Sequence, residues 1–329
     1  MRIVVTGGCG FIGRNLLASA LERGHQVRAL DHLSATGTPD LAEIGPFTLL
    51  EGPPSGWEDR IQVVRADVAD LAAVERLCAG ADAVVHLAAS TGIAESLQAP
   101  YEHCAANVLG TLAVLETCRR RGIRRCVLAS SGAVLGEVEP PMHEALLPNP
   151  ISPYGASKLA GEALGLAYRA SFGLGAVALR FSNVYGPHSG HKSSVVARFI
   201  TTILDGGALT IYGDGRQTRD FLFVRDLVGG IWAALATDRP PGGVYQIGSG
   251  VETSVADLFR RLGDLAESRL GRRPEVRHAG RRPGEVQRNY ADIKRAREDL
   301  GYAPATPLDR GLEETFDWFL ARRHRPAGR

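Results

Sequence analysis

The sequence predicts an α/β fold built on a doubly wound parallel sheet, and its 329 residues leave room for a smaller α/β lobe. Three observations support this prediction. Short apolar runs alternate with longer segments of helical periodicity, a glycine-rich turn follows the first apolar run, and polar or small residues stand where the later runs end. Ligands of such sheets bind outside the carboxyl ends of the strands. We therefore expect the functional site along that edge.

The first predicted strand, residues 3–5, leads into three glycines spaced three residues apart, Gly7, Gly10 and Gly13. A helix is expected over residues 11–23. A glycine has no β-carbon, so the chain can turn tightly, let a pyrophosphate approach and pack helix against strand. Free N–H groups at the start of that helix would bind an anion. The pattern predicts a dinucleotide site.

A second strand, residues 26–30, ends at Asp31. A carboxylate in this position can accept hydrogen bonds from both hydroxyls of an adenosine ribose, and its charge would repel a 2′-phosphate. The sequence therefore favours NAD over NADP as the cofactor.

Further elements follow in order. Residues 32–60 contain many glycines and prolines and predict a surface excursion with one short helix near 41–44. Strands are expected at 61–65, 83–86 and 126–129, and helices at 71–79, 101–121 and 153–168. His86 ends one of these strands and could be a base, although a histidine ending an apolar run is more often structural. The small residues after it would let a cofactor approach the backbone.

Tyr154 and Lys158 lie four residues apart in the helix expected at 153–168, so the phenol and the ammonium share one face. A neighbouring cation favours the phenolate and lowers the pKa of a tyrosine. A serine at the end of the preceding strand, Ser130 or Ser131, could relay the proton. We interpret this set as a catalytic base with its activating groups.

The composition excludes several classes of partner. Lysine and arginine total 38 against 36 acidic residues, which argues against nucleic acid or an anionic membrane surface. No apolar run has the length of a membrane span and no signal-peptide pattern opens the chain, so we expect a cytoplasmic protein. Five scattered cysteines lack metal-ligand spacing, which indicates reduced thiols and no bound metal.

Taken together, these segments resemble the extended short-chain dehydrogenase/reductase superfamily. Within it they are most similar to the nucleotide-sugar epimerase/dehydratase group, and closest in pattern to UDP-hexose 4-epimerases. The resemblance spans nearly the whole chain and rests on these stretches: TGGCGFIG, ADVAD, HLAAS, NVLGT, SSGAVLG, YGASK, RFSNVYGP, YGDGRQTRDFLFVRD, YQIGSG and RPGEV.

The resemblance implies a role for each matching position. Catalysis is implied for Ser131 as proton relay, Tyr154 as base and Lys158. NAD binding is implied for Gly7, Gly10, Phe11, Ile12, Gly13, Asp31, Asp67, Val68, Leu87, Ala88, Ala89, Asn107, Tyr154 and Lys158. Substrate binding is implied for Ser131, Asn183, Val195, Tyr212, Arg219, Arg282 and Glu285, with Arg216 as a further candidate for the diphosphate. His191 and Lys192 could meet the sugar or its phosphates, or lie in an exposed loop.

One departure from the relatives narrows the reaction. Sugar 4,6-dehydratases carry an Asp-Glu pair directly after the relay hydroxyl, and here those positions are Gly132 and Ala133. The prediction is therefore C4 epimerisation of a nucleotide-diphosphate hexose through a transient 4-keto sugar, with substrates of the UDP-glucose, UDP-N-acetylhexosamine or UDP-glucuronate type. The alternatives are a 4-ketoreductase, a UDP-glucuronate decarboxylase, or a non-catalytic sensor of sugar nucleotide or NAD.

The expected organisation is a Rossmann-type NAD-binding domain at residues 1–180, with a return segment near 220–250. A sugar-nucleotide-binding lobe is expected at 181–320 and a basic tail at 321–329. Family resemblance also suggests a homodimer formed by the helices near residues 100–120 and 153–170.

Overall fold

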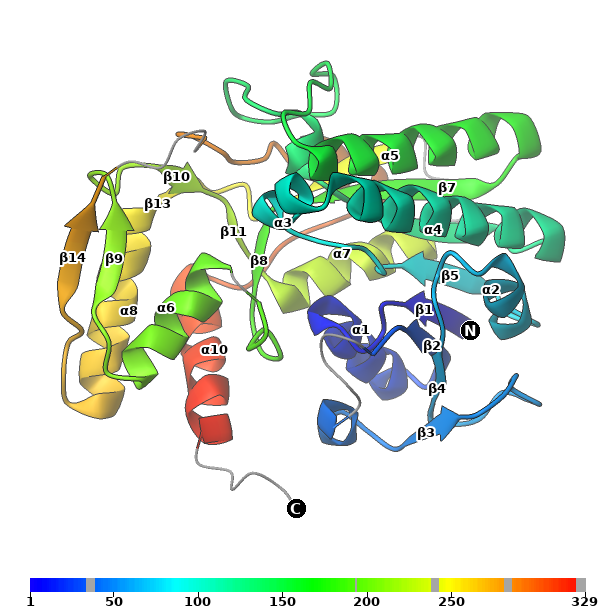
Figure 1. Cartoon of the computed structure of the whole chain (residues 1–329), viewed down its shortest axis with the longest axis horizontal. Helices are drawn as coiled ribbons and strands as arrows, with labels where there is room; N and C mark the ends of the chain where they lie inside the picture. Colours follow the sequence, from blue (N-terminus) through cyan, green and yellow to red (C-terminus); the bar gives the residue numbers. More distant parts are fainter. Residues whose placement is uncertain (34–38, 193, 238–242, 281–285, 324–329) are drawn as a thin grey trace.

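A computed structural model describes residues 1–33, 39–192, 194–237, 243–280 and 286–323. Its main feature is an eight-stranded sheet in which every neighbouring pair is parallel (Figure 1). The strand order is β12 (Val244–Ile247), β7 (Gly175–Phe181), β6 (Arg125–Ser131), β5 (Ala83–His86), β1 (Arg2–Thr6), β2 (Gln26–Asp31), β4 (Ile61–Arg65) and β3 (Phe47–Leu50). The predicted Rossmann-type fold is confirmed.

Helices cover both faces of this sheet, as its apolar strands require. One face carries α1 (Phe11–Glu22), α7 (Val224–Ala236) and α9 (Lys294–Leu300), and the other carries α2 (Leu71–Leu77), α4 (Pro100–Arg121) and α5 (Pro153–Phe172). Figure 1 shows α4 and α5 lying side by side, with the short α3 (Ile93–Gln98) at their ends. Two 3-10 turns, η1 (Pro39–Glu43) and η2 (Gly132–Val134), complete this part.

The start of α5 follows from its local sequence. Ser152 caps the helix by accepting a hydrogen bond from the N–H of Gly155 at 3.1 Å, and Pro153 occupies the first turn, where a missing N–H costs nothing. Gly173, with φ of 68°, ends the helix. These signals fix where Tyr154 stands relative to the strand ends.

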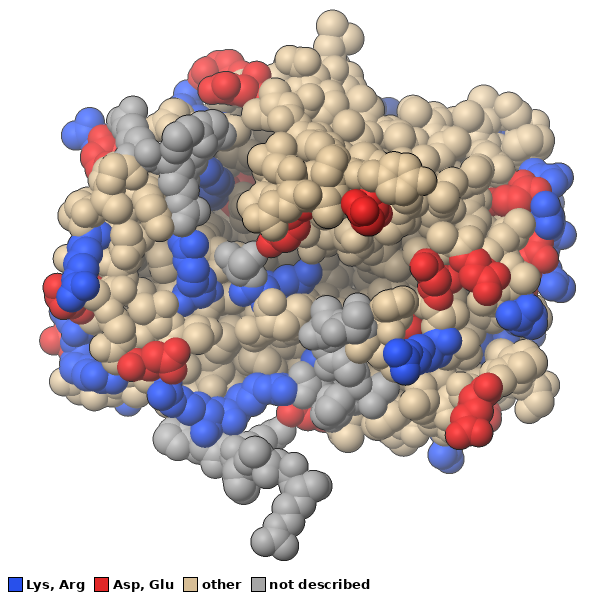
Figure 2. All heavy atoms as spheres, in the orientation of Figure 1, with Lys and Arg blue, Asp and Glu red and all other residues tan. Residues whose placement is uncertain are grey.

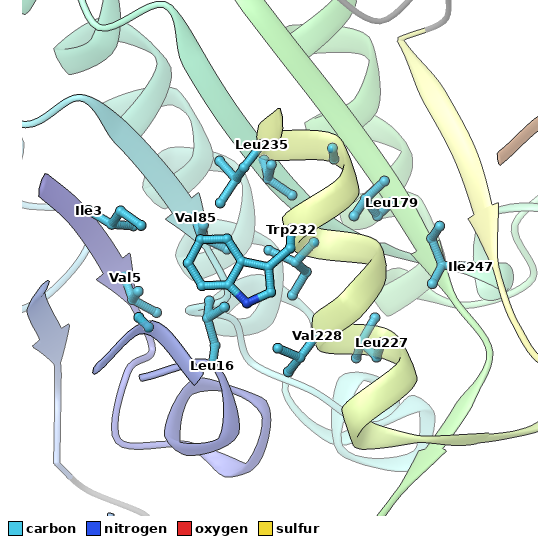
Figure 3. Packing of buried hydrophobic residues seen from close by; sticks show 14 of the residues in the cluster. Ile3, Val5, Leu16, Val85, Leu179, Leu227, Val228, Trp232, Leu235 and Ile247 are labelled. Carbon is cyan, nitrogen blue, oxygen red and sulfur yellow. The ribbon is translucent and has the colours of Figure 1, made fainter. Parts of the chain in front are cut away.

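The core under the first face centres on Trp232 of α7. Figure 3 shows its indole lying between α7 and the side chains of β1 and α1. The ring nitrogen donates to Ser19 Oγ at 3.0 Å, so the buried indole has its polar partner. Helix α7 therefore belongs to the core of the large sheet, although it follows residue 220 in the chain.

A second apolar cluster forms beside the sheet, at the left of Figure 1. It gathers α6 (Val195–Leu204), α8 (Val255–Leu270) and α10 (Leu308–Arg323), and three small strand pairs belong to the same part of the chain. The pairs are β8 (Asn183–Tyr185) with β11 (Phe221–Phe223), β9 (Leu209–Tyr212) with β14 (Val276–Ala279), and β10 (Thr218–Arg219) with β13 (Thr253–Ser254). The boundary predicted near residue 180 stays a prediction.

The short helix expected near 41–44 is present as η1, but two other short elements were not predicted from the sequence. The excursion at 32–60 contains β3, which pairs in parallel with β4 from Phe47 to Leu50 and extends the sheet by one edge strand. The segment after β5 contains α3, which was not expected. Both elements are short and partly exposed, so their sequences carry little apolar periodicity.

Two further observations concern the described part of the chain. None of its helices is both long and apolar enough to cross a membrane. All five cysteines are free, and no group of histidine, cysteine, aspartate and glutamate side chains among the described residues could hold a metal ion.

Candidate active site

A cleft of about 1160 Å³ runs from the glycine turn, past the carboxyl ends of the parallel strands, to the second apolar cluster. Figure 2 shows a hollow near the middle of this face, with lysine and arginine atoms inside it. The cleft brings together these residues predicted from the sequence: Gly7, Gly10, Phe11, Ile12, Gly13, Asp31, Asp67, Val68, Leu87, Ala88, Ala89, Tyr154, Lys158, Asn183, Val195, Tyr212 and Arg219.

The glycine turn leaves no room for side chains. A β-carbon on Gly7, whose φ is 70°, would lie 2.6 Å from the backbone nitrogen of Ala88. A β-carbon on Gly13 would meet the carbonyl oxygens of Gly7 and Gly8, the latter at 2.6 Å. The turn, the start of α1 and the segment after β5 thus approach one another backbone to backbone. The space left beside them fits a pyrophosphate.

Asp31 stands at the end of β2 and is held by two backbone donors. The N–H of Cys9 donates to one carboxylate oxygen and the N–H of Leu33 to the other, both at 2.9 Å. Each oxygen keeps a lone pair, and the residue lines the cleft. Two acceptors in one plane are what a ribose diol requires, so the residues present fit an adenine dinucleotide.

Tyr154, Lys158 and Ser131 meet where β6 and α5 come together. Burial raises the pKa of Tyr154, and a hydrogen bond with the Ser131 hydroxyl lowers it. Lys158 Nζ donates to the carbonyl oxygen of Ala129 at 2.9 Å and lies 6.0 Å from the centroid of the Tyr154 ring. Burial and the neighbouring Lys192 lower the pKa of Lys158 to about 8. That Lys158 lowers the pKa of Tyr154 stays a prediction.

The two serines at the end of β6 have different surroundings. Ser130 Oγ donates to Glu162 Oε1 at 2.5 Å, and Glu162 forms a two-bond ion pair with Arg180 at 2.8 Å for each bond. Because its only proton is used there, Ser130 cannot also donate to Tyr154. Ser131 is the serine in contact with the phenol. Ser130 lines the cleft and Ser131 is not among its lining residues, so the choice of Ser131 over Ser130 stays a prediction.

Asn107 differs from its expected place. It is 3% exposed and lies behind the cleft, where its amide binds both the N–H and the carbonyl of Ser90. Its Nδ2 also donates to Ser157 Oγ at 2.9 Å. Asn107 therefore shapes the cleft wall through Ser90 instead of forming its surface.

On the substrate side, Arg219 lines the cleft and donates from Nη1 to the carbonyls of Thr218 and Val286. Arg216 behaves differently from the expectation, because its side chain is 89% exposed beside Asp214. The predicted substrate residues Arg282 and Glu285 lie outside the described residues.

Two neighbours of the site, His103 and Glu95, had no role in the sequence-based predictions, while His191 and Lys192, for which a sugar contact or an exposed loop was left open, both line the cleft. His103 packs edge-on against Tyr154, with ring centroids 5.9 Å apart, and it precedes Asn107 by four residues on the same face of α4. That spacing could have revealed it. Glu95 from the unexpected α3 lines the cleft as well. Lys192 Nζ reaches Thr91 Oγ1 at 3.5 Å, which brings the loop before α6 against the segment after β5.

The positions directly after Ser131 carry no ionisable group. A β-carbon on Gly132 would lie 2.9 Å from the terminal methyl of Met142, which is 3% exposed and packs with Val134 and Leu135. Met142 itself is tied by backbone hydrogen bonds to residues 290 and 292. A larger side chain at 132 would have to move this methyl group, which is the flexible end of the Met142 side chain.

The fold and the cleft define a dinucleotide-binding α/β protein, and comparison with known proteins agrees. Residues 3–248 match the model of the NAD-dependent epimerase/dehydratase family, and the chain belongs to this family. It is a member of the extended short-chain dehydrogenase/reductase group and uses NAD.

Relatives in this family differ in their reactions. The chain is 36% identical to a putative UDP-glucose 4-epimerase of Methanocaldococcus jannaschii, over 96% of this chain and 97% of that one. It is 34% identical to a dTDP-glucose 4,6-dehydratase of Streptomyces antibioticus, over 100% and 97%. The structure of UDP-glucuronic acid 4-epimerase from Bacillus cereus, in complex with UDP-glucuronic acid and NAD, superposes with a TM-score of 0.83 at 31% identity, covering 98% and 100%. Overall similarity therefore supports both reactions.

Proposed function

We propose that this protein is an NAD-dependent C4 epimerase of a nucleotide-diphosphate hexose, with a substrate of the UDP-glucose, UDP-N-acetylhexosamine or UDP-glucuronate type. One observation carries the choice of reaction. Ser131 contacts Tyr154, while Gly132 and Ala133 beside them supply no acid or base. Dehydration needs a proton removed at C5 and water expelled at C6, whereas epimerisation at C4 needs only one proton and one hydride.

In the proposed mechanism Tyr154 removes the proton of the sugar 4-hydroxyl, directly or through Ser131. NAD supplies the hydride acceptor when bound. Lys158 stands on the same face of α5 and places a positive charge where the phenolate forms. Arg219 would hold the diphosphate while the 4-keto sugar turns over, so that hydride returns to the opposite face. Tyr154 gives the proton back, and no net redox change occurs.

The test is to incubate the purified protein with UDP-glucose, UDP-N-acetylglucosamine or UDP-glucuronate and to follow C4 configuration by NMR. Inversion at C4 without net NADH formation is expected with at least one sugar. A 4-keto-6-deoxy product would identify a dehydratase, carbon dioxide release a decarboxylase, and net consumption of NADH or NADPH a ketoreductase. Tyr154→Phe should lower the rate by about 10²- to 10⁴-fold, since it removes the base and keeps the ring.

A homodimer formed by α4 and α5 is also part of the proposal. Their outer surfaces expose large apolar side chains, including Tyr101 at 81%, Leu109 at 53% and Phe172 at 56%. Apolar side chains gathered on two adjacent helices favour burial against a partner, and a second copy would supply the same pair of helices. The cytoplasmic location expected from the sequence stays a prediction.

A further inference from the structure

A chain of buried hydrogen bonds runs beneath the cofactor side of the cleft. It joins Thr6 at the end of β1, His86 at the end of β5 and Thr111 on α4, which are 0%, 4% and 7% exposed. Thr6 Oγ1 lies 2.7 Å from His86 Nδ1, and His86 Nε2 lies 3.1 Å from Thr111 Oγ1. Both ring nitrogens of a buried histidine thus face a hydroxyl group.

Donor accounting fixes the direction of every bond in this chain. Thr111 donates its only hydroxyl proton to the carbonyl of Asn107 at 2.7 Å, because a carbonyl can only accept. Thr111 must therefore accept from His86, which places a proton on Nε2. A neutral imidazole then has an acceptor at Nδ1, so Thr6 donates to it. Thr6 in turn accepts from the N–H of Ala88 at 3.3 Å.

The same chain extends to the helix that carries Tyr154. Asn107, which accepts from Thr111 through its carbonyl, uses its side chain to bind Ser90 and Ser157. Ser157 Oγ donates to the backbone carbonyl of Tyr154 at 2.8 Å. These hydrogen bonds therefore link the cleft segment 87–90 with the first turn of α5. The segment is bound at two points, the N–H of Ala88 and the backbone of Ser90.

We propose that His86 is locked as the neutral Nε2–H tautomer, and that His86 and Thr111 are positioning residues. They hold the segment Leu87–Ser90 against the cofactor and in register with Tyr154. Neither His86 nor Thr111 is among the residues that line the cleft. The positioning role rests on the NAD site of the proposed function and is independent of which sugar the protein takes.

The surroundings of His86 agree with a neutral ring. Burial lowers the pKa of His86 to about 3, and the positive charge of Lys158 lowers it as well. A protonated ring would carry a proton on Nδ1, which would face Thr6 as a second donor and displace its hydroxyl proton. The chain can exist in its observed direction only while the ring is uncharged.

The tautomer can be observed directly in the NAD-loaded protein labelled with ¹⁵N at histidine. Long-range ¹H–¹⁵N correlation should assign His86 a protonated Nε2 and an unprotonated Nδ1, with His86→Gln identifying the signal. A proton on Nδ1, or on both nitrogens at neutral pH, would overturn the proposal. Sugar turnover plays no part in this experiment, so its result is separate from the test of the proposed function.

The positioning role is tested with three threonine variants on α4. Thr111→Val removes the acceptor of His86 at nearly constant volume, and Thr111→Ser restores it. Thr117→Val is the matched control, because Thr117 is fully buried on the same helix and its hydroxyl has no partner among the described residues. The measurement is the rate at which bound NAD leaves the protein into an excess of an NAD-consuming dehydrogenase.

NAD should leave Thr111→Val about tenfold faster than the wild type. Without the hydrogen bond to His86, the segment Leu87–Ser90 spends part of its time in conformations that hold NAD poorly. Thr111→Ser and Thr117→Val should release NAD at the wild-type rate. If Thr111→Val and Thr117→Val accelerate release equally, the effect is only that of a lost buried hydroxyl and the positioning role is wrong. If Thr111→Val does not fold, the tautomer of the wild-type protein still decides the first part of the proposal.

Discussion

Replacing Gly13 by alanine tests how tightly the glycine turn is built. The new methyl group would meet the carbonyl oxygens of Gly7 and Gly8, which are backbone atoms and can move only if the turn moves. Forcing an extra carbon into a packed site costs about 1–3 kcal/mol. The turn would also shift away from the pyrophosphate position. We expect a loss of NAD affinity of tenfold or more, which is about 1.4 kcal/mol or above.

The control is Gly229→Ala. Gly229 also lies inside a helix, α7, but a β-carbon there would have no atom within 4 Å. Alanine in an open helical position stabilises by about 0.5–1 kcal/mol relative to glycine. Urea unfolding and the NAD retained after gel filtration measure both variants. If Gly13→Ala unfolds at the wild-type urea concentration and keeps its NAD, the argument from close backbone approach is refuted.

Three further predictions concern the buried ion pair, the buried lysine and the surface of α4 and α5. Glu162→Met leaves the buried Arg180 without its counter-charge and should lower the free energy of unfolding in urea by about 3–5 kcal/mol. The double variant Glu162→Met, Arg180→Met should recover most of that loss. Equal stability of the single and the double variant would contradict this prediction. Folding lowers the pKa of Lys158 from 10.5 to about 8. Below pH 8 the lysine is protonated in both the folded and the unfolded state, and burying its charge lowers the free energy of unfolding by the full amount. Above pH 10.5 it is neutral in both states and this cost disappears. The free energy of unfolding of NAD-free Lys158→Met should then exceed that of the NAD-free wild type by up to about 3 kcal/mol at pH 7. If this difference did not close between pH 8 and 10.5, the buried charge of Lys158 would be excluded as its cause. Leu109→Glu and Phe172→Glu should each halve the mass measured by light scattering. Val276→Glu is the control, at an apolar side chain that is 45% exposed on β14, and should leave the mass unchanged. A wild-type mass below that of a dimer would show that the proposed interface does not form.

The large sheet could be predicted because its strands are buried on both faces and read as apolar runs. The glycine turn and Asp31 could be placed as well, because each stands at the end of one of these strands. β3 and α3 were missed because both are short and partly exposed. Their positions depend on partners outside their own short sequences, which are β4 for β3, and α4 and α5 for α3.

The candidate site was predicted where chemistry follows local order, as with Tyr154 and Lys158 on one helical face. It could not be predicted where a side chain has two possible directions. Asn107 turns toward Ser90 behind the cleft wall, and Arg216 turns into solvent. The environments that separate Ser130 from Ser131 come from Glu162 and Tyr154, and only the folded chain brings these to the end of β6.

The contact between Gly132 and Met142 limits how this protein could acquire a different reaction. A side chain introduced at 132 would bring its β-carbon to 2.9 Å from the Met142 methyl group, so that methyl group would have to move. Met142 is also fastened by its backbone to residues 290 and 292, so its own path cannot easily change. An acid at 132 would therefore also require the Met142 side chain to repack against Val134 and Leu135. A residue outside the reacting groups thus takes part in deciding which side chains position 132 accepts.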